Sequence, residues 1–266
     1  MKIYFHKYQG TGNDFIMIDN RLGEYNNIIN TQTVEYLCNR RFGIGADGLI
    51  LMENSDDAAF KMRYFNSDGQ EASMCGNGGR CIAAFAAKLK IVPINTIFDF
   101  DAVDGKHQAK VSNTIVSLKM CDVREIKKFS DGYFLDTGSP HFVILCNNVE
   151  EIDVFSEGKK SRNDARFEDI GGANVNFLTI NENKSLSVRT FERGVEDETL
   201  SCGTGSVASA IVAYHLDKTR SEFDIKVLGG YLKVKLKEQP DGTIEDIWLE
   251  GAAEFVFEGF INSNKE

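Results

Sequence analysis

Two cysteines, each followed directly by glycine, are the residues of this chain best suited to chemistry. They lie in Cys75-Gly76-Asn77-Gly78 and in Cys202-Gly203-Thr204-Gly205. Each motif opens a stretch that is typical of a helix, so each thiol is expected beside the N–H groups of a helix N-terminus, which favour negative charge. This position lowers the pKa of a cysteine below its ordinary value. Two matching sites suggest a reaction with one thiol on each side of a substrate.

The chemistry that fits two such thiols is inversion of a carbon stereocentre by proton transfer. This reaction needs a base on one face of the carbon and an acid on the other, and a cysteine tuned toward neutral pH can do either. Paired helix N-termini would stabilise the charge that develops on an α-carboxylate. The scheme needs no pyridoxal phosphate, and no lysine lies in an obvious Schiff-base motif. A buried cysteine before a helix cap is the simpler interpretation of one copy alone, but not of two in matching contexts.

The segments before the two cysteines follow the same order of residue types. Arg63-Tyr64-Phe65-Asn66 and Arg189-Thr190-Phe191-Glu192 each end an alternating strand, and each is followed by a glycine turn, an acidic stretch and the Cys-Gly-x-Gly motif. The two copies lie about half a chain apart, far more than the roughly 20–50 residues of common structural repeats. The sequence therefore predicts a duplicated domain.

The composition is that of a soluble globular protein and says little about a small substrate. The chain has 266 residues, of which 42% are hydrophobic and 26% charged, and a formal net charge of -10. Nucleic-acid binding is not expected, because it needs clustered lysine and arginine. No apolar stretch approaches the roughly 18 residues of a membrane span. The segment Met1–Lys7 alternates like a strand and lacks the apolar core of a signal peptide, so a cytoplasmic location is expected.

The other four cysteines are expected to be reduced core residues, as is usual for a cytosolic protein of this size. They are Cys38, Cys81, Cys121 and Cys146, all in apolar or periodic surroundings. No Cys-x2-Cys or His-x3-His pair occurs, so no metal is expected.

Two helices must position the two catalytic candidates. The first follows Cys75 and the second spans residues 203–216, and both are rich in alanine. The second is small and apolar nearly all round, which is typical of a buried helix. A third helix is expected from Asn30 to near Gly43, and a charged surface stretch at 157–169. Strands are expected at 2–8, 15–19, 49–53, 59–66, 96–101, 108–112, 114–120, 133–137, 141–145, 174–179, 185–191, 223–227, 231–236, 243–249 and 254–260.

These elements predict an α+β fold with two similar halves, each a mixed sheet or half-barrel wrapped around a central buried helix. The polar segment 122–132 is the best boundary, so residues 1–120 form the N-terminal half with Cys75 and residues 121–266 the C-terminal half with Cys202. The last strand is allowed to return to the first half. The active site is expected in a cleft between the halves, a common place for small-molecule sites.

The chain resembles the diaminopimelate epimerase family over its full length. Each motif of this resemblance is weak alone, but their order and spacing together are specific. The motifs are Gly10-Thr11-Gly12-Asn13-Asp14-Phe15, Arg41-Phe42-Gly43-Ile44-Gly45-Ala46-Asp47-Gly48, Asn66-Ser67-Asp68-Gly69, Cys75-Gly76-Asn77-Gly78-Gly79-Arg80-Cys81, Gly138-Ser139-Pro140-His141, Asn174, and Glu192-Arg193-Gly194 running on to Cys202-Gly203-Thr204-Gly205.

The resemblance implies a cofactor-independent isomerase with an α+β fold of this kind. The implied reaction interconverts LL-2,6-diaminopimelate and meso-2,6-diaminopimelate in lysine and peptidoglycan biosynthesis, and the implied assembly is a cytoplasmic homodimer. Cys75 and Cys202 are the implied acid–base pair, with electrostatic support from His141 and Glu192. The implied substrate contacts are Asn13, Asn66, Gly76, Asn77, Asn174, Glu192, Arg193, Gly203 and Thr204.

Two positions depart from the family pattern. Gly48 stands where some members have glutamine, and Ser139 stands where many have asparagine. Glycine has no side chain to contact a substrate, and serine reaches less far than asparagine. Neither residue is therefore included in the predicted site.

Several of these residues also have simpler structural interpretations. His141 at a strand start could be a structural histidine, and Glu192 with Arg193 could be a solvated ion pair, although an arginine fork suits a substrate carboxylate. Turn or cap roles are open for Asn13, Asn66 and Asn174.

Three other functions stay open on the sequence alone. A proline-racemase-like activity would also use two cysteines, although the Gly10–Phe15 motif and Asn77 favour the epimerase. Acyl transfer by a cysteine nucleophile, with His141 as base, would leave one cysteine motif without a role. A thiol redox or anion-binding protein is the non-enzymatic alternative, and incorporation of solvent hydrogen into an amino acid distinguishes it from an epimerase.

Overall fold

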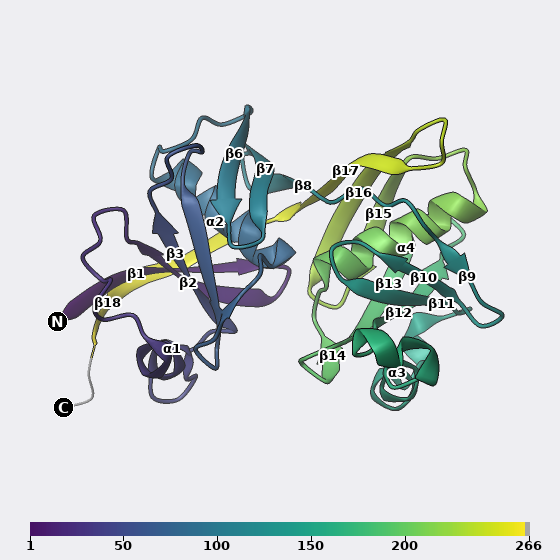
Figure 1. Cartoon of the computed structure of the whole chain (residues 1–266), viewed down its shortest axis with the longest axis horizontal. Helices are drawn as coiled ribbons and strands as arrows, with labels where there is room; N and C mark the ends of the chain where they lie inside the picture. Colours follow the sequence, from purple (N-terminus) through teal and green to yellow (C-terminus); the bar gives the residue numbers. More distant parts are fainter. Residues whose placement is uncertain (264–266) are drawn as a thin grey trace. The chain divides into compact units, whose positions relative to one another are not determined.

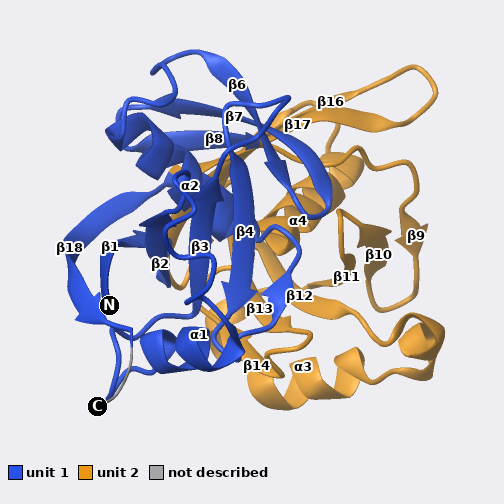
Figure 2. Cartoon of the chain, turned by 60° about the vertical axis from the view of Figure 1, so that its left-hand side comes forward, with its two compact units in different colours: residues 1–118, 252–266 blue, residues 119–251 orange. Residues whose placement is uncertain are grey.

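The computed structural model describes residues 1–263, and the chain forms two compact units (Figure 1; Figure 2). Unit 1 comprises Met1–Leu118 with Ala252–Glu266, and unit 2 comprises Lys119–Gly251. The boundary predicted from the sequence, after residue 120, differs from these units mainly in the segment from Ala252 onward, which belongs to unit 1. That segment carries β18 (Glu254–Asn262), which pairs antiparallel with β1 (Lys2–Gly10) along most of its length, so hydrogen bonding to β1 joins it to unit 1.

Unit 1 is built around α2 (Gly76–Lys88), which contacts strands β1, β2, β3, β7 and β18. Leu49 and Leu51 pack in one core cluster with Val34 and Leu37 of α1, whereas Ile50 lies against the first turn of α2. The remaining elements of unit 1 are β2 (Asn13–Asp19), α1 (Thr31–Cys38), β3 (Gly48–Glu53), β4 (Lys61–Asn66), β5 (Glu71–Ala72), β6 (Ile97–Ala102), β7 (Gly105–Ser112) and β8 (Ile115–Lys119).

Unit 2 is built around α4 (Gly203–Leu216), which contacts β10, β11, β12, β13 and β16. Val175 and Phe177 of β12 pack with Val154 of α3, and Asn176 between them lies against the first turn of α4. The remaining elements are β9 (Lys127–Lys128), β10 (Tyr133–Asp136), β11 (Pro140–Leu145), η1 (Val149–Glu151), α3 (Val154–Arg162), η2 (Ala165–Ile170), β12 (Asn174–Ile180), β13 (Leu186–Glu192), β14 (Asp197–Thr199), β15 (Glu222–Val227), β16 (Gly230–Glu238) and β17 (Ile244–Ala252).

The two units have the same order of strand pairing. In unit 1, β1–β2 is antiparallel, β2–β3 parallel, β3–β4 and β4–β5 antiparallel, β4–β6 parallel, and β6–β7 and β7–β8 antiparallel. Unit 2 repeats this order from β10 to β17. The same bidentate ion pair also recurs beside the short hairpins: Arg63 with Glu71, both bonds 3.0 Å, and Arg189 with Glu198, 2.6 and 2.7 Å. These equivalences fit a duplicated domain.

The expected central helices are confirmed. α4 begins and ends at the residues that the sequence predicts, and ten of its residues are buried, including Val207, Ala210 and Ile211. Ten residues of α2 are buried as well. No helix among residues 1–263 is both long and apolar enough to cross a membrane.

Some elements differ from the expectations. The charged stretch at 157–169 is mostly helical, in α3 and η2, and only Val154 and Gly158 of α3 are buried, so its narrow apolar face gives a weak periodic signal. The helix capped by Asn30 ends at Cys38 rather than near Gly43. Gly43 is needed there for a different reason, because a methyl group on it would lie 2.0 Å from the Tyr36 carbonyl oxygen.

Candidate active site

The thiol of Cys75 lies at the N-terminus of α2. Cys75 is the N-cap residue, with extended backbone angles, and its carbonyl accepts a hydrogen bond from the Gly79 N–H at 2.7 Å. The first turn packs tightly, since a methyl group at Gly78 would lie 3.1 Å from Ile50 and one at Gly79 would lie 2.8 Å from Met74. The half-buried thiol is therefore held at the positive end of the helix dipole.

The hairpin turn between β1 and β2 is held against this end of α2. Gly10 pairs with Asn13, and both turn residues have positive φ, 51° at Thr11 and 89° at Gly12, as in the type I′ turns that suit two-residue hairpins. A β-branched residue rarely adopts this conformation. The Thr11 hydroxyl accepts a hydrogen bond from Arg80 of α2 at 3.0 Å, which holds the start of β2 beside the helix N-terminus.

Asn13 connects the hairpin to Cys75. Its Oδ1 accepts hydrogen bonds from Cys75 Sγ at 3.7 Å and from Asn77 Nδ2 at 3.3 Å. Its Nδ2 donates to Asp47 Oδ2 at 2.5 Å. The structure therefore brings three of the predicted site residues of unit 1 together, and adds Asp47, which the sequence analysis did not single out.

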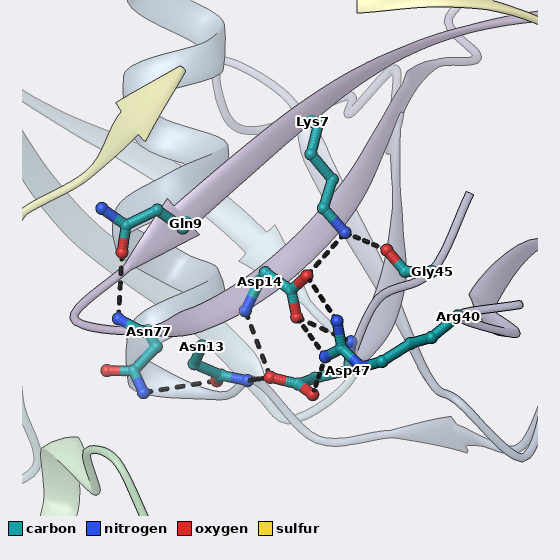
Figure 3. A network of polar contacts seen from close by, with 9 residues as sticks. Lys7, Gln9, Asn13, Asp14, Arg40, Gly45, Asp47 and Asn77 are labelled. Atoms are coloured by element: carbon teal, nitrogen blue, oxygen red, sulfur yellow. Dashed lines mark hydrogen bonds and ion pairs between the residues drawn. The ribbon is translucent and has the colours of Figure 1, made fainter. Parts of the chain in front are cut away.

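Asp47 belongs to a network of charged side chains (Figure 3). Arg40 donates to both oxygens of Asp14, at 2.7 and 3.0 Å, and to Asp47 at 2.7 Å. The buried Lys7 ammonium pairs with Asp14 at 2.7 Å and donates to the Gly45 carbonyl. Burial alone would raise the pKa of Asp14, but hydrogen bonds from Arg40 and Lys7 outweigh it and lower this pKa to about 2.

Arg80 is fully buried beneath the Cys75 end of α2. Its Nη2 donates to Thr11 Oγ1 and to Asn77 Oδ1, both at 3.0 Å. Burial lowers the pKa of Arg80, while the neighbouring thiols Cys81 and Cys75 favour its charge. Its Nε has no hydrogen-bond partner among residues 1–263. Arg80 thus fixes the Asn77 amide and places a buried cation near Cys75.

Cys202 occupies the equivalent position in unit 2. It is the N-cap residue of α4, 8% exposed, and its carbonyl accepts hydrogen bonds from the N–H and the hydroxyl of Ser206, each at 2.9 Å. Its Sγ lies 3.5 Å from Thr204 Oγ1. A methyl group at Gly205 would lie 2.2 Å from Asn176 Oδ1, so glycine is needed where α4 meets β12.

The hairpin turn between β10 and β11 lies against the N-terminus of α4, as the β1–β2 turn does in unit 1. Gly138 in this turn has a φ of 97°. The Thr137 hydroxyl donates to the Thr204 carbonyl at 3.0 Å, and the Ser139 hydroxyl donates to Thr204 Oγ1 at 3.3 Å. Ser139, which the sequence analysis left out of the site, is therefore linked to Cys202 through the Thr204 hydroxyl.

His141 is buried and neutral. Its Nε2 lies 3.0 Å from Ser139 Oγ, and its Nδ1 lies 3.0 Å from Asn176 Nδ2. Burial, and then the positive charge of Arg193, lower the pKa of His141 to about 3. At neutral pH the imidazole can act through hydrogen bonds but carries no charge.

Asn174 and Arg193 are joined by a hydrogen bond from the Arg193 N–H to Asn174 Oδ1 at 2.9 Å. Asn174 Nδ2 donates to the Pro140 carbonyl at 3.1 Å. The Arg193 guanidinium donates to the main-chain carbonyls of Ile170 and Gly172 at 3.0 and 3.3 Å. Glu192 is the half-buried last residue of β13, so both members of the Glu192-Arg193 pair lie at one end of this strand.

Asn66 and Gly48 lie apart from these contacts. Asn66 is exposed at the end of β4, and its main chain forms a turn with Gly69 and Gln70. A methyl group at Gly48 would lie 2.6 Å from the Phe65 carbonyl oxygen and from the Tyr64 ring. Gly48 is thus required by strand packing.

The sequence analysis missed the residues that orient the predicted ones. They are Lys7, Arg40, Asp47, Arg80 and Asn176. Alternation could have found Asn176, because in β12 it lies two residues from Asn174, so both point to the same face of the sheet. Within residues 1–263, no group of three His, Cys, Asp or Glu side chains is arranged to hold a metal ion.

Comparison with known proteins gives a consistent set of relatives. The family model described as diaminopimelate epimerase matches residues 5–122 and 133–256. A diaminopimelate epimerase of Flavobacterium psychrophilum is 50% identical over 263 residues, which cover 97% of this chain and 99% of the relative. One of Chlorobaculum tepidum is 46% identical over 264 residues, which cover 95% of this chain and 98% of the relative.

Solved structures with low sequence identity share the fold. A phenazine biosynthesis protein of the PhzF family from Bacillus anthracis superposes with a TM-score of 0.78 at 14% identity, covering 98% of this chain and 99% of that one. A probable proline racemase from Agrobacterium radiobacter K84 superposes with a TM-score of 0.71 at 14% identity, covering 98% and 93%. The two-part mixed α+β fold expected from the sequence is confirmed.

Proposed function

Since this chain belongs to the diaminopimelate epimerase family, we propose that it interconverts LL-2,6-diaminopimelate and meso-2,6-diaminopimelate by a two-cysteine acid–base mechanism. This isomerisation serves lysine and peptidoglycan biosynthesis. One observation supports the mechanism most strongly: Cys75 and Cys202 each cap the central helix of one unit, at equivalent positions in the same topology.

In the proposed reaction, one sulfur removes the α-proton of the substrate and the other replaces it from the opposite face. The cysteine present as thiolate takes the α-proton from one face, and the cysteine present as thiol gives its proton to the other face. The stereocentre is inverted, and the two cysteines have exchanged protonation states. No electron is transferred and no proton is gained or lost overall, so the reverse reaction starts from the exchanged state.

The proposed transition-state stabiliser is the N-terminal turn of each helix. Removal of the α-proton places negative charge on the α-carboxylate, and N–H groups already fixed in a helix turn stabilise such charge without reorganisation. The residues proposed to supply them are Gly76 and Asn77 of α2, and Gly203 and Thr204 of α4.

The remaining substrate contacts are proposals for the amino and carboxylate groups of diaminopimelate. The positions of Asn13 and Asn174 support this role, because hydrogen bonds already orient their amides. The proposed contacts are Asn13, Asn174, Asn66, Glu192 and Arg193. His141 and Glu192 are proposed to support the cysteines, and His141 would do so as a neutral hydrogen-bonding group.

We propose that no cofactor takes part, because the two cysteines supply both acid and base. The test is exchange of solvent hydrogen: the purified protein is incubated with LL-diaminopimelate in D2O, and the α-proton signal and the appearance of the meso isomer are followed by NMR. Deuterium in the product and epimerisation, unchanged by added pyridoxal phosphate, are expected. A requirement for pyridoxal phosphate, or exchange with L-proline but not with diaminopimelate, would contradict the proposal.

We also propose that the enzyme is a cytoplasmic homodimer. The support for a dimer is a run of exposed apolar side chains along β18, since exposed apolar patches mark interaction surfaces. Its exposed apolar residues are Phe255, Val256, Phe257 and Phe260, which are 42–68% exposed. Light scattering coupled to size-exclusion chromatography should give twice the mass of one chain, and a Phe260→Glu variant should give the single-chain mass.

A further inference from the structure

The two cysteines face different hydrogen-bonding groups. In unit 1 the hairpin residue Asn13 contacts Asn77, the second residue after Cys75. In unit 2 the hairpin residue Ser139 contacts Thr204, the second residue after Cys202. The two pairs occupy corresponding places, but the first consists of amides and the second of hydroxyls. Amides have separate donor and acceptor atoms, whereas a hydroxyl can do both, so the direction of each hydrogen bond has to be worked out.

In unit 1 the direction is fixed by Asp47. A carboxylate oxygen can only accept a hydrogen bond, so the Asn13 atom that faces Asp47 at 2.5 Å is the Nδ2 donor. The other end of the amide, Oδ1, therefore faces Cys75 Sγ at 3.7 Å. Arg40 in turn holds Asp47 at 2.7 Å. Because Oδ1 is an acceptor, this contact favours Cys75 as the protonated thiol, which donates to it.

In unit 2 the amide of Asn174 fixes the directions of the hydrogen bonds. Its Oδ1 accepts from the Arg193 N–H, and its Nδ2 donates to the Pro140 carbonyl. A main-chain N–H can only donate and a carbonyl can only accept, so this amide has one orientation. The same Nδ2 lies 3.4 Å from Ser139 Oγ, which therefore acts as an acceptor toward Asn174.

His141 supplies the second donor to Ser139. Asn176 Nδ2 lies 3.0 Å from His141 Nδ1, and the Thr190 hydroxyl donates to Asn176 Oδ1 at 2.9 Å. An amide N–H can only donate a hydrogen bond, so His141 Nδ1 is the acceptor. The neutral imidazole then carries its proton on Nε2, which donates to Ser139 Oγ at 3.0 Å.

With both acceptor sites of Ser139 Oγ occupied, its own proton is directed to Thr204 Oγ1 at 3.3 Å. Thr204 in turn directs its proton to Cys202 Sγ at 3.5 Å. A sulfur that receives an O–H bond is favoured as the thiolate, because hydrogen bonds to a charged acceptor are the stronger ones.

We propose that the resting protein holds Cys202 as the thiolate and Cys75 as the thiol. Ser139 and Thr204 are the positioning residues that direct a hydroxyl proton to Cys202, and Asp47 is the positioning residue that turns the Asn13 acceptor toward Cys75. Ser139 is too short to reach the sulfur as Asn13 does, and Thr204 bridges the gap. This inference rests on the two-cysteine reaction proposed above. In that reaction, Cys202 is the base that acts first in the free enzyme.

The charged groups near each sulfur act alongside these contacts. Near Cys75, the Arg80 cation favours a thiolate, and the Asp47 and Asp14 carboxylates, paired with Arg40 and Lys7, oppose it. Strands β10, β11, β13 and β16 pack against α4. Around the N-terminus of α4 these strands carry the ionisable groups Asp136, His141 and Glu192, and Arg193 adjoins Glu192. Glu238 of β16 contacts Tyr214 at the other end of α4. For Cys75 to rest as the thiol, the hydrogen bond that it donates to Asn13 has to outweigh the attraction of the Arg80 charge for a thiolate.

The test is alkylation of each cysteine as a function of pH. The intact protein without substrate is pulsed with iodoacetamide at a series of pH values, and modification of each cysteine is quantified by peptide mass spectrometry. The expected midpoint is lower for Cys202 than for Cys75. Thr204→Val should raise the Cys202 midpoint by about one pH unit, Ser139→Ala should shift it in the same direction, and Thr204→Ser should leave it unchanged because the hydroxyl is kept. Asp47→Ala should lower the Cys75 midpoint, since Asn13 is then free to turn.

The buried thiols provide an internal control in the same samples. Burial raises the pKa of Cys38 and of Cys81 to about 12, so both should stay unmodified while the protein is folded, and thermal unfolding of each variant checks that it is. Nitrogen-15 NMR of the histidines, with His141 assigned by its loss in His141→Asn, should show the Nε2–H tautomer.

A lower midpoint at Cys75 than at Cys202, an unchanged Cys202 midpoint in folded Thr204→Val, or an Nδ1–H tautomer would each overturn the assignment. None of these measurements uses turnover. Equal midpoints in an enzyme that epimerises diaminopimelate would contradict only this inference. Unequal midpoints in a protein that exchanges no hydrogen into diaminopimelate would contradict only the proposed function.

Discussion

At the scale of single residues, each cysteine is placed by its position in the backbone rather than by a side-chain cap. Both Cys75 and Cys202 are N-cap residues with extended backbone angles, and neither side chain makes the capping hydrogen bond that serine or aspartate would make. Each helix therefore begins at a residue that adds nothing to its stability through a cap. This loss fits residues that are kept for acid–base chemistry.

The first prediction concerns these two residues. Cys75→Ala and Cys202→Ala should each lower the rate of epimerisation by about 10²- to 10⁴-fold, the usual contribution of a positioned acid or base, because one face of the α-carbon loses its proton donor or acceptor. The rate is measured by NMR in D2O. The melting temperature of each variant serves as the control for folding, and near-normal turnover in either folded variant would rule out the two-cysteine mechanism.

The second prediction separates Glu192 from Arg193. Arg193→Met keeps the length of the side chain but removes its donors, so it should raise KM about tenfold or more, the loss expected for a hydrogen bond to a charged group, with a smaller effect on kcat. Glu192→Gln should mainly lower kcat or shift its pH profile, because the charge that is proposed to support the cysteines is lost. Steady-state kinetics across pH distinguish the two. Small and equal effects would restore the interpretation as a surface ion pair.

At the scale of elements, the hairpin turn and the helix N-terminus form one structural piece in each unit. In unit 1 this piece is held by the charged network of Lys7, Asp14, Arg40 and Asp47. The network lies where β1, β2 and the segment before β3 meet (Figure 3). It fixes the start of β2, from which Asn13 reaches Cys75. Unit 2 achieves the same placement with hydroxyl and amide groups.

The third prediction is a pH-dependent contribution of Asp14 to stability. The pKa of Asp14 is lowered to about 2 in the folded protein and is about 4 in an unfolded chain. A carboxyl group with a lowered folded-state pKa stabilises the fold above pH 4 and loses this contribution as the pH falls toward 2. Asp14→Asn should therefore reduce the free energy of unfolding by about 2 kcal/mol at pH 7, and by progressively less between pH 4 and pH 2.

Urea unfolding at several pH values measures this difference. Asp56→Asn is the matched control, because Asp56 is an exposed aspartate in the loop between β3 and β4, and it should leave the unfolding free energy nearly unchanged at each pH. A constant difference between wild type and Asp14→Asn from pH 7 to pH 2 would mean that the substitution acts through packing rather than through charge.

The sequence predicts elements well where their pattern is local, and poorly where it depends on the fold. The helix at 203–216 was predicted to the residue, because small apolar residues continue on all its faces. The strands β5, β9 and β14 have only two or three residues and leave no periodic signal. In the same way, Cys75 and Asn77 could be predicted from a short motif. The contacts of Asn13 with Asp47 and of His141 with Asn176 join segments that are far apart in the sequence, and no pattern along the chain encodes them.

At the scale of the whole molecule, duplication explains why one chain carries two similar sites. The pairing order of strands β1 to β8 recurs in β10 to β17, and the hairpin turn lies on the helix N-terminus in both units. A duplicated domain supplies two thiols in equivalent frameworks. The side chains around each thiol then differ, which supports the proposal that one begins the reaction as a base and the other as an acid.

The last prediction uses a disulfide bond to measure the approach of the two units. If one substrate carbon lies between Cys75 and Cys202 during turnover, closure of the empty site should bring the sulfurs within bonding reach, since a disulfide needs Cβ atoms about 3.5–4.5 Å apart. Diamide accepts the two electrons and two protons that the thiols release. Treatment with diamide should therefore inactivate the enzyme through a Cys75–Cys202 bond, and dithiothreitol should restore activity.

Bound substrate should protect against this inactivation, because it separates the sulfurs. The buried thiols Cys38 and Cys81 should not react, since burial raises the pKa of both. A Cys121→Ser variant removes the exposed Cys121 as a competitor. Peptide mapping of the inactive protein is the decisive measurement. A bond from either catalytic cysteine to Cys121 or Cys146, or two thiols still reduced in inactive protein, would show that the sulfurs do not approach each other as the two-cysteine mechanism requires.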